Sequence, residues 1–205
     1  MPPAFLYFDL GKVLLDFDLE VMCRQMGEVA CLEPAKVREA LFAGHLQRQY
    51  ELGEITSREF YEAFCRATGA SADCDALVHA GSDIFTVNAT MLPVVSHLRR
   101  AGYRLGILSN TCEGHWEHCR RRFRILQDTF EQYALSYRLR AAKPDPAIYL
   151  AAAKLAGVEP REIFFTDDIA GHVEGAKAVG FDAVQYLATP QLVDELRKRG
   201  LDFGY

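Results

Sequence analysis

One supersecondary unit recurs three times after residue 90, and this recurrence is what most constrains the fold. Each unit is a stretch with helical periodicity, then a glycine, then a short apolar run; the units read MLPVVSHLRRAG with YRLGILSN, PAIYLAAAKLAG with VEPREIFFTDD, and HVEGAKAVG with FDAVQY. The glycines, Gly102, Gly157 and Gly180, stand where a helix C-cap is left-handed. Strands that are apolar nearly throughout are buried on both faces, so this alternation predicts an α/β fold with a Rossmann-like parallel sheet covered by helices.

A different kind of sequence separates the first predicted strand from these units. Residues 5–8 form an apolar run that suits the first strand of the same sheet. From about residue 18 to residue 90, helical patterns follow one another with no convincing strand between them. We therefore expect a core of residues 1–17 and 88–205 and an inserted, small, all-helical cap subdomain of residues 18–87. Because the insertion follows the first strand directly, it should lie over the carboxyl end of that strand, where open α/β sheets bind ligands.

Composition and charge argue against several classes of protein. Charged residues make up 25% and hydrophobic residues 50% of the chain, which is typical of a globular protein, and no apolar run is long enough to span a bilayer. The formal net charge of -5 disfavours nucleic-acid binding, which needs a basic surface. The initial MPPA lacks the basic and apolar regions of a signal peptide, so we expect a cytoplasmic protein without a membrane partner. The six scattered cysteines form no CxxC pair and are expected to be reduced.

Polar residues stand at the carboxyl ends of the predicted strands or in the loops just after them. They are Asp9, Ser109, Asn110, Lys143, Asp167 and Asp168. Parallel strands bring their carboxyl ends to one edge of the sheet, so residues that are far apart in the sequence should form one constellation there. Taken singly, each residue has a structural alternative as a turn residue, a helix cap or part of a solvated loop.

The residue types in this set suit phosphoryl transfer. Three converging carboxylates repel one another, and a divalent metal keeps them ionised side by side. Oxygen ligands and a need for open coordination positions favour Mg²⁺. A hydroxyl, an amide and an ammonium are suitable donors to phosphoryl oxygens, and an aspartate at the centre can attack phosphorus to form an aspartyl-phosphate that water later hydrolyses.

These residues stand in four motifs that resemble those of the haloacid dehalogenase-like (HAD) hydrolases. FDLGKVL is similar to the first motif, ILSN to the second, Lys143 in AAKPDPAIY to the third, and FFTDD followed by EGAKAVGF to the fourth. The likeness covers essentially the whole chain, and the helical insertion is similar to the small cap of this family. Within the family, FDLG and the segment ELGEITSREFYEAFC resemble small bacterial phosphatases that act on glucose 1-phosphate. The phosphatase domain of soluble epoxide hydrolase is the next likeness.

The resemblance implies a role for each residue of the constellation. Asp9 would be nucleophile and metal ligand, the backbone carbonyl of Gly11 a second ligand, and Asp168 a third, with Asp167 in support. Ser109 and Asn110 would hold phosphate oxygens. Lys143 would neutralise the charge of the nucleophile and of the phosphoryl group. The implied cofactor is Mg²⁺, and the implied partner is a small phosphorylated substrate.

The first motif departs from the family pattern in a way that bears on the substrate. Most phosphatases of the family read D-x-D-G-T there, whereas this chain has Gly11 in place of the second acid, which usually protonates the leaving oxygen. A metal ligand at that position is a backbone carbonyl, so the ion need not be lost. Proton donation is typically worth about 10²–10⁴-fold in rate, and its loss matters least for leaving groups that are stable as anions. We therefore expect a Mg²⁺-dependent phosphatase for a small phosphorylated metabolite, with a hexose 1-phosphate as one candidate.

Two other functions stay open. A haloacid dehalogenase also uses an aspartate nucleophile and also lacks the second acid. Members that cleave carbon–halogen bonds generally lack the paired acids that Asp167 and Asp168 form here, which argues against this alternative. A catalytically weak phosphate- or partner-binding protein would keep the fold without turnover, although a pure binder gains nothing from an attacking carboxylate.

Several other residues have both a functional and a structural interpretation. HWEHC places His115, His118 and Cys119 at i, i+3 and i+4, which suggests zinc ligands but lacks a fourth partner, so a surface helix or the substrate rim is favoured. His115 also follows the phosphate-binding turn closely enough to be a substitute proton donor. His172 stands four residues after Asp168, where many family members have an acid or an asparagine.

Two clusters remain without an assigned role. Four arginines lie close together at Arg120, Arg121, Arg122 and Arg124. They form either a solvated helix face or a docking patch for an anionic partner. In the cap, the residues that follow a helix end at Gly44 either select the substrate or form a solvated loop. These are His45, Gln47, Arg48 and Tyr50.

Overall fold

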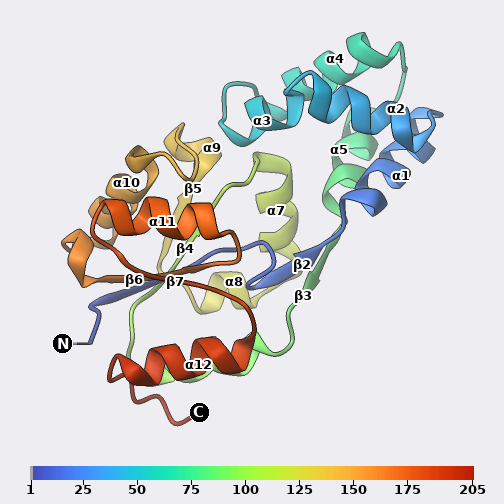
Figure 1. Ribbon diagram of the computed structural model, residues 1–205. Coiled ribbons are helices and arrows are strands. Elements are labelled where there is room, and N and C mark those ends of the chain that lie inside the picture. Colours follow the sequence, from blue (N-terminus) through green and yellow to red (C-terminus); the bar gives the residue numbers. More distant parts are fainter. Residues whose placement is uncertain (1) are drawn as a thin grey trace.

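Five parallel strands form the central sheet of the structure, a computed structural model that describes residues 2–205 (Figure 1). The strand order is β5-β4-β1-β6-β7. The strands are β1 (Phe5–Phe8), β4 (Leu105–Ser109), β5 (Gln132–Leu135), β6 (Ile163–Asp167) and β7 (Asp182–Gln185). All residues of β1, β4 and β6 are buried, as expected for apolar strands covered on both faces. The predicted α/β fold with a parallel sheet is confirmed.

Helices cover both faces of the sheet, and β1 shows the two-residue alternation that this requires (Figure 1). Leu6 and Phe8 pack in one hydrophobic cluster with α6 (Met91–Arg100) and α12 (Thr189–Lys198). Phe5 and Tyr7 pack in a second cluster with α10 (Pro146–Ala156) and α11 (Ala170–Ala178) on the opposite face. The sheet is therefore the middle layer of three, and its carboxyl edge is left for loops.

A group of helices lies beside the core between β1 and α6 (Figure 1). The cap helices are α1 (Leu19–Ala30), α2 (Pro34–Arg38), a π-helical turn (Glu39–Ala43), α3 (Leu46–Glu51), α4 (Ser57–Thr68) and α5 (Cys74–Ser82). Polar side chains start the longer ones: Asp18 accepts from the amide of Glu20, and Thr56 forms a capping box with Glu59. Helices therefore make up most of the stretch between β1 and α6.

Three short strands went unpredicted. β2 (Leu15–Phe17) and β3 (Phe85–Val87) form an antiparallel ribbon at the base of the cap helices, so one strand does lie inside the stretch expected to be purely helical. Each has three residues and an exposed position in its middle, which leaves no clear period to detect. The edge strand β5 was also missed, because half of it is only partly buried. It is flanked by two short helices, α8 (Ile125–Asp128) and α9 (Ser136–Leu139).

The cap helices touch the core through short polar contacts around α7 (Glu113–Arg122) and α9. The hydroxyl of Ser57 donates to Glu113 Oε2 at 2.5 Å, and the amide of Gly114 donates to the Tyr50 hydroxyl at 2.8 Å. Near α9, the hydroxyl of Ser136 donates to the carbonyl of Glu51 at 2.6 Å. These contacts fix where the cap helices sit relative to the loops that follow β4 and β5.

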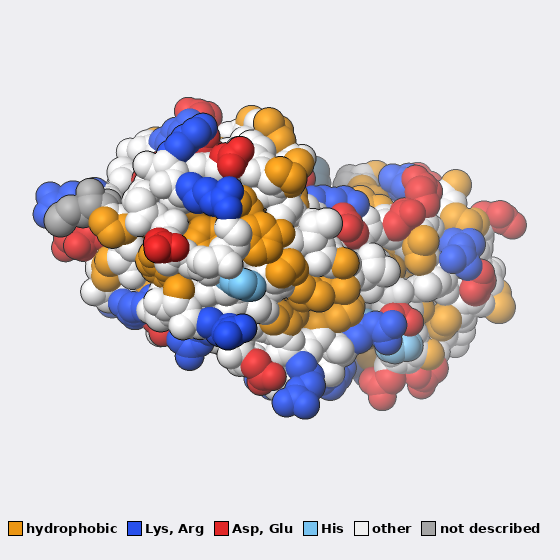
Figure 2. Space-filling view, turned by 90° about the horizontal axis from the view of Figure 1, so that it is seen from below, with side chains coloured by type: hydrophobic (Ala, Val, Ile, Leu, Met, Phe, Trp, Pro, Cys, Tyr) orange, Lys and Arg blue, Asp and Glu red, His pale blue; other side chains and the backbone are white. Residues whose placement is uncertain are grey.

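The surface is mixed in charge on the side of α12. Figure 2 shows Lys and Arg interspersed with Asp and Glu on this face, with hydrophobic side chains between them and no single basic patch. Part of this surface is formed by the C-terminal residues, where the His97 and Tyr205 rings meet edge to face with centroids 5.8 Å apart. Within residues 2–205, no helix combines the length and the apolarity needed to cross a membrane. All six cysteines in that part of the chain are unpaired.

The tight centre of the sheet yields a stability prediction at Gly106 in β4. A Cβ atom there would lie 2.5 Å from Tyr7 Cε1 and 2.7 Å from Phe5 Cε1, and both rings are fully buried. We expect Gly106→Ala to lower the free energy of unfolding by about 1–3 kcal/mol, measured by urea denaturation. Gly171→Ala in α11 is the control, because a Cβ there meets nothing within 4 Å and alanine favours helix. Equal stability of the two variants would contradict the packing argument.

Candidate active site

The predicted constellation assembles at the carboxyl edge of the sheet because β1 lies between β4 and β6. Phe8 pairs with Thr166 on one side and with Ile107 on the other, so the next residue, Asp9, lies beside the end of both neighbours. The amide of Asp9 donates to the carbonyl of Thr166 at 3.0 Å. Carboxylate oxygens of Asp9, Asp167 and Asp168 all lie within 4.8 Å of one another. The three acids meet, although Asp9 and Asp167 are 158 positions apart in the sequence.

Lys143 joins two of these acids. Its Nζ lies 2.9 Å from Asp9 Oδ1 and 2.5 Å from Asp167 Oδ2, and it donates to the carbonyl of Leu108 at 3.1 Å. Burial, which leaves 2% of Lys143 exposed, lowers the pKa of its ammonium group, but the two carboxylates outweigh burial and the net shift is upward. Lys143 is therefore a fixed positive charge in the middle of the acids.

Both carboxylate oxygens of Asp167 are occupied by hydrogen-bond and ion-pair partners within the protein. It is fully buried, and besides Lys143 it contacts His172 Nδ1, which lies 3.1 Å from both carboxylate oxygens, and the amide of Ile169 at 2.8 Å. Burial raises the pKa of Asp167. The hydrogen bond to His172 and the charge of Lys143 lower the pKa by more than burial raises it, so the net shift is downward. Asp167 therefore stays ionised and holds Lys143 and His172 in position. The contact with His172 was not foreseen from the sequence.

The negative charges of Asp9 and Asp168 are less fully balanced by neighbouring donors and cations than the charge of Asp167 is. Burial raises the pKa of Asp9 to about 6, with Asp167 adding to the rise and with Lys143 and Ser109 opposing it. Burial also raises the pKa of Asp168, and the charge of Asp167 raises it further. Two partly uncompensated carboxylates next to a buried third one fit a hard divalent cation with oxygen ligands, because the cation favours their charged forms.

Ser109 and Asn110 end the neighbouring strand β4, as the sequence predicted. Ser109 is 3% exposed and belongs to the surroundings of Asp9. The side chain of Asn110 bridges to the backbone of Lys143: its Nδ2 donates to the carbonyl at 3.0 Å, and its Oδ1 accepts from the amide at 2.8 Å. Both polar atoms of that side chain thus hold the Lys143 loop, a function the sequence did not indicate.

The ring of Phe17 explains why residue 11 is a glycine. A Cβ atom at Gly11 would lie 2.8 Å from Cε1 of the Phe17 ring. Lys12, which has a φ of 59°, covers the same ring with its Nζ 4.8 Å from the centroid. Any side chain at residue 11 would have to displace Phe17, so the absence of a second acid is built into the packing of β2. Sequence reasoning missed Phe17 because its contact with Gly11 is tertiary.

The residues of HWEHC do not converge on a metal. The only group of metal-ligating side chains found in residues 2–205 is the three acids described above. His115 Nε2 lies 3.1 Å from the carbonyl of Gly81 in α5, which commits this ring to the cap helices. Burial lowers the pKa of His115 to about 4, so it is neutral at pH 7. The idea that His115 replaces the missing proton donor is therefore not supported.

The other unassigned residues lie at element ends or in the cap. Arg120 is exposed in the last turn of α7, where positive charge is favourable, and pairs with Glu117 at 3.7 Å. Arg124 is exposed at the start of α8 and pairs with Asp128 at 3.5 Å. In α3, Gln47 and Tyr50 are buried, and Gln47 donates to Glu51 at 2.9 Å. Only His45 and Arg48 of the four cap candidates are exposed.

The family model for haloacid dehalogenase-like hydrolases matches residues 8–180, which include all four motifs. The chain belongs to this family. This confirms the resemblance drawn from the sequence, and it makes the protein a HAD-like hydrolase by family. The match runs from the residue before Asp9 to Gly180, one residue short of the end of the fourth motif, so the site described above lies within it.

Similar proteins include enzymes that act on phosphate esters. A D-ribitol-5-phosphate phosphatase from Bacteroides thetaiotaomicron is 25% identical over 185 residues, which cover 87% of this chain and 89% of that protein. A HAD family enzyme from the same organism, solved with magnesium and inorganic phosphate, superimposes with a TM-score of 0.80 at 27% identity over 89% of this chain and 93% of that one. A phosphatase from Mycobacterium tuberculosis is 35% identical, but over 91 residues, which are 44% of this chain and 42% of that protein.

Removing the positive charge of Lys143 should lower the stability of the fold, because two buried carboxylates lose their shared ion-pair partner. Lys143→Met leaves Asp9 and Asp167 without their shared cation, and breaking a buried ion pair typically destabilises by about 3–5 kcal/mol. We expect a loss of that order in the free energy of unfolding at pH 7, measured with EDTA present. Lys154→Met on the exposed side of α10 is the matched control and should change stability little. The interpretation is wrong if both variants lose the same amount.

His115 should make stability depend on pH. Its pKa is about 4 in the folded protein against the ordinary 6.5 in the unfolded chain. Between these values the unfolded chain binds a proton that the folded chain does not, so the free energy of unfolding falls as the pH drops from 6.5 towards 4. We expect this to contribute about 1–3 kcal/mol, seen as a flatter pH profile in His115→Gln. His45→Gln, at an exposed position, should keep the slope of the wild type; parallel wild-type and His115→Gln profiles would contradict the argument.

Proposed function

We propose that this protein is a Mg²⁺-dependent phosphatase that hydrolyses a small phosphorylated metabolite through an aspartyl-phosphate on Asp9. The observation that carries the proposal is Asp9 itself: a nearly buried carboxylate, held beside a lysine and within reach of two further acids. The likeness to a D-ribitol-5-phosphate phosphatase over most of both chains supports the same reaction class. Residues 18–87 would act as a cap over the site.

The residues present fit a magnesium ion. Asp9, Asp168 and the backbone carbonyl of Gly11 would hold it, with Asp167 in support through Lys143 and His172. When bound, Mg²⁺ supplies positive charge that keeps the carboxylates ionised and offsets the charge of the phosphoryl oxygens. A structural relative that was solved with magnesium and inorganic phosphate supports this choice of cation.

In the proposed reaction, a carboxylate oxygen of Asp9 attacks phosphorus, and the bond from phosphorus to the leaving oxygen breaks. The electron pair stays on the leaving oxygen, which takes a proton from water. Ser109 would donate to a phosphoryl oxygen, as would the backbone amide of Asn110, and Lys143 would offset negative charge on both Asp9 and the phosphoryl group. A water molecule then attacks the phosphorus, which releases inorganic phosphate and restores the Asp9 carboxylate.

The packing of Phe17 against Gly11 bears on the substrate. No side chain at residue 11 can protonate the leaving oxygen, and His115 is neutral and turned towards α5. Esters whose leaving group is stable as an anion should therefore react best. Aryl, acyl and glycosyl phosphates, including a hexose 1-phosphate, have such leaving groups. The exact metabolite is a matter for the cap residues, since the core site recognises only phosphate.

Replacing the nucleophile tests the proposal most directly. We expect Asp9→Asn to lower kcat for p-nitrophenyl phosphate by on the order of 10³-fold or more, because the attacking oxygen is lost. Asp16→Asn in β2 is a matched control at an exposed position and should retain wild-type turnover. Beryllium fluoride, a mimic of the aspartyl-phosphate, should bind the wild type in the presence of Mg²⁺ and fail to bind Asp9→Asn. Turnover that survives in Asp9→Asn would overturn the proposal.

A comparison of leaving groups tests the consequence of Gly11. The measurement is kcat/KM with Mg²⁺ for p-nitrophenyl phosphate, glucose 1-phosphate and glycerol phosphate. We expect glycerol phosphate to be slowest, by about 10²–10⁴-fold, since an alkoxide is the poorest leaving group without a proton donor. Equal or faster turnover of glycerol phosphate would show that another group supplies the proton. Release of halide from 2-chloropropionate without metal would instead favour a dehalogenase.

A further inference from the structure

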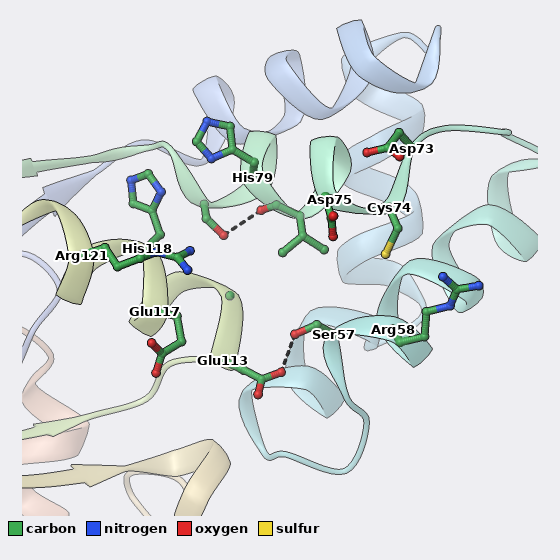
Figure 3. Close-up of a pocket in the computed structure, with 13 residues that line it drawn as sticks. Ser57, Arg58, Asp73, Cys74, Asp75, His79, Glu113, Glu117, His118 and Arg121 are labelled. Atoms are coloured by element: carbon green, nitrogen blue, oxygen red, sulfur yellow. Dashed lines mark hydrogen bonds between the residues drawn. The ribbon is translucent and has the colours of Figure 1, made fainter.

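Two contacts between the cap helices and the core differ in where they lie. In the first, α4 and α5 face α7 across a cavity of about 890 Å³, beside which Ser57 donates to Glu113 (Figure 3). None of the residues that line this cavity stands at the carboxyl end of a strand. In the second, α3 packs against α9, which directly follows β5. The second contact therefore borders the edge of the sheet at which Asp9 lies.

The end of α3 is fixed to the loops that follow β4 and β5. The hydroxyl of Ser136, the residue after β5, donates to the carbonyl of Glu51 at 2.6 Å, and its oxygen accepts from the amide of Thr111 at 2.9 Å. Gly53 has a φ of 65°, and a Cβ atom there would overlap the carbonyl oxygen of Tyr137. Main-chain contacts on both sides therefore set the position of Glu51.

Glu51 lies over the ends of the strands next to Asp9. Ser109 pairs with Leu135, so the Ser136 hydroxyl that holds Glu51 lies just beyond the residue proposed to bind phosphate. In the order β5-β4-β1, the strand before Ser136 is two strands from the strand before Asp9, which is about 10 Å. A small ester whose phosphoryl group lies at Asp9 and Ser109 can therefore reach Glu51 with its leaving group.

One oxygen of the Glu51 carboxylate has no donor. Its Oε1 accepts from Nε2 of Gln47 at 2.9 Å, whereas within residues 2–205 no group donates to Oε2. Burial raises the pKa of Glu51, and the hydrogen bond from Gln47 and the charge of Arg48 offset only part of this rise. The side chain is partly exposed, so a ligand can reach the free oxygen. A second donor there would stabilise the carboxylate as Gln47 does.

The charges around Glu51 favour a neutral donor. An ionised carboxylate only accepts hydrogen bonds, and it repels an anionic leaving group more strongly in buried surroundings than in water. The guanidinium of Arg48 already offsets part of its charge, so a cationic leaving group would gain little. A hydroxyl is neutral and donates a hydrogen bond, which is what the free oxygen lacks.

We propose that Glu51 is a specificity-determining residue, which accepts a hydrogen bond from a hydroxyl of the leaving group. The inference rests on the proposed phosphatase reaction at Asp9 and narrows its substrate class. Among the aryl, acyl and glycosyl phosphates, whose leaving groups are stable as anions, the glycosyl phosphates carry several hydroxyls and fit this residue. Glu51 takes no part in breaking the bond to phosphorus and selects the substrate by binding.

Kinetics with Mg²⁺ on matched esters test the assignment. Galactose 1-phosphate and mannose 1-phosphate each differ from glucose 1-phosphate in the orientation of one hydroxyl, and phenyl phosphate has no hydroxyl. We expect Glu51→Gln to lower kcat/KM for the best hexose 1-phosphate about tenfold relative to phenyl phosphate, mainly through KM, because a charge-assisted hydrogen bond is lost. Glu54→Gln, at an exposed glutamate in the same segment, is the matched control and should keep the wild-type ratio.

Binding is measured separately from turnover. In Asp9→Asn, which should not hydrolyse the ester, the same hexose 1-phosphate is titrated calorimetrically with Mg²⁺ present. Adding Glu51→Gln should raise its Kd about tenfold, and adding Glu54→Gln should leave the Kd as it was. An unchanged Kd or an unchanged kinetic ratio in Glu51→Gln would overturn the proposal. A wild type that hydrolyses phenyl phosphate but none of the three hexose 1-phosphates would do the same.

The two proposals fail in different ways. A wild-type protein that hydrolyses no ester of this set, phenyl phosphate included, refutes the phosphatase function and with it the role of Glu51. Hydrolysis of phenyl phosphate with the same ratio in the wild type, Glu51→Gln and Glu54→Gln leaves the reaction at Asp9 standing and refutes the role of Glu51 alone.

Discussion

The ion pairs of Lys143 are the interaction on which the site depends. One ammonium group contacts Asp9 after β1 and Asp167 at the end of β6, while Asn110 after β4 holds the backbone of the same lysine. Three strands are thus tied together at their carboxyl ends by a single residue that lies on a loop. The ties are buried, so they are little screened by solvent, and none of the partners can leave without stranding a charge. The ion pairs of Lys143 therefore fix both the arrangement of the acids and the local stability of this edge of the sheet.

Two adjacent acids differ because their surroundings differ. Asp167 points into the core and is saturated by Lys143, His172 and a backbone amide, which keeps its pKa low. Asp168 is only partly buried, and burial together with the charge of Asp167 raises its pKa. Asp167 therefore positions other groups, whereas the carboxylate of Asp168 lacks such partners and is the one that can bind a cation. A paired-acid motif in a sequence does not reveal this division, because it depends on which of the two side chains meets Lys143 and His172 in the folded protein.

The sequence predicted what local patterns and strand polarity determine. Apolar strands followed by Asp9, Ser109 and Asp167 required a parallel sheet, and a parallel sheet required those residues to meet. It did not predict β5, β2 or β3, which are short or half exposed and leave little periodicity. It also did not predict contacts between distant segments, such as Phe17 against Gly11 or Asn110 against Lys143. Such contacts depend on the packed fold, so only coordinates reveal them.

The contacts between the cap helices and the core bear on how a substrate reaches Asp9. Asp9 is 6% exposed, and if residues 18–87 act as the proposed cap, these helices would move away from the core to admit a substrate. This movement would break polar contacts such as Ser57 to Glu113 and Tyr50 to Gly114, whose partners water can replace at little net cost. It would also separate α5 from α7, which pack against each other, so the larger cost of opening is the loss of that packing.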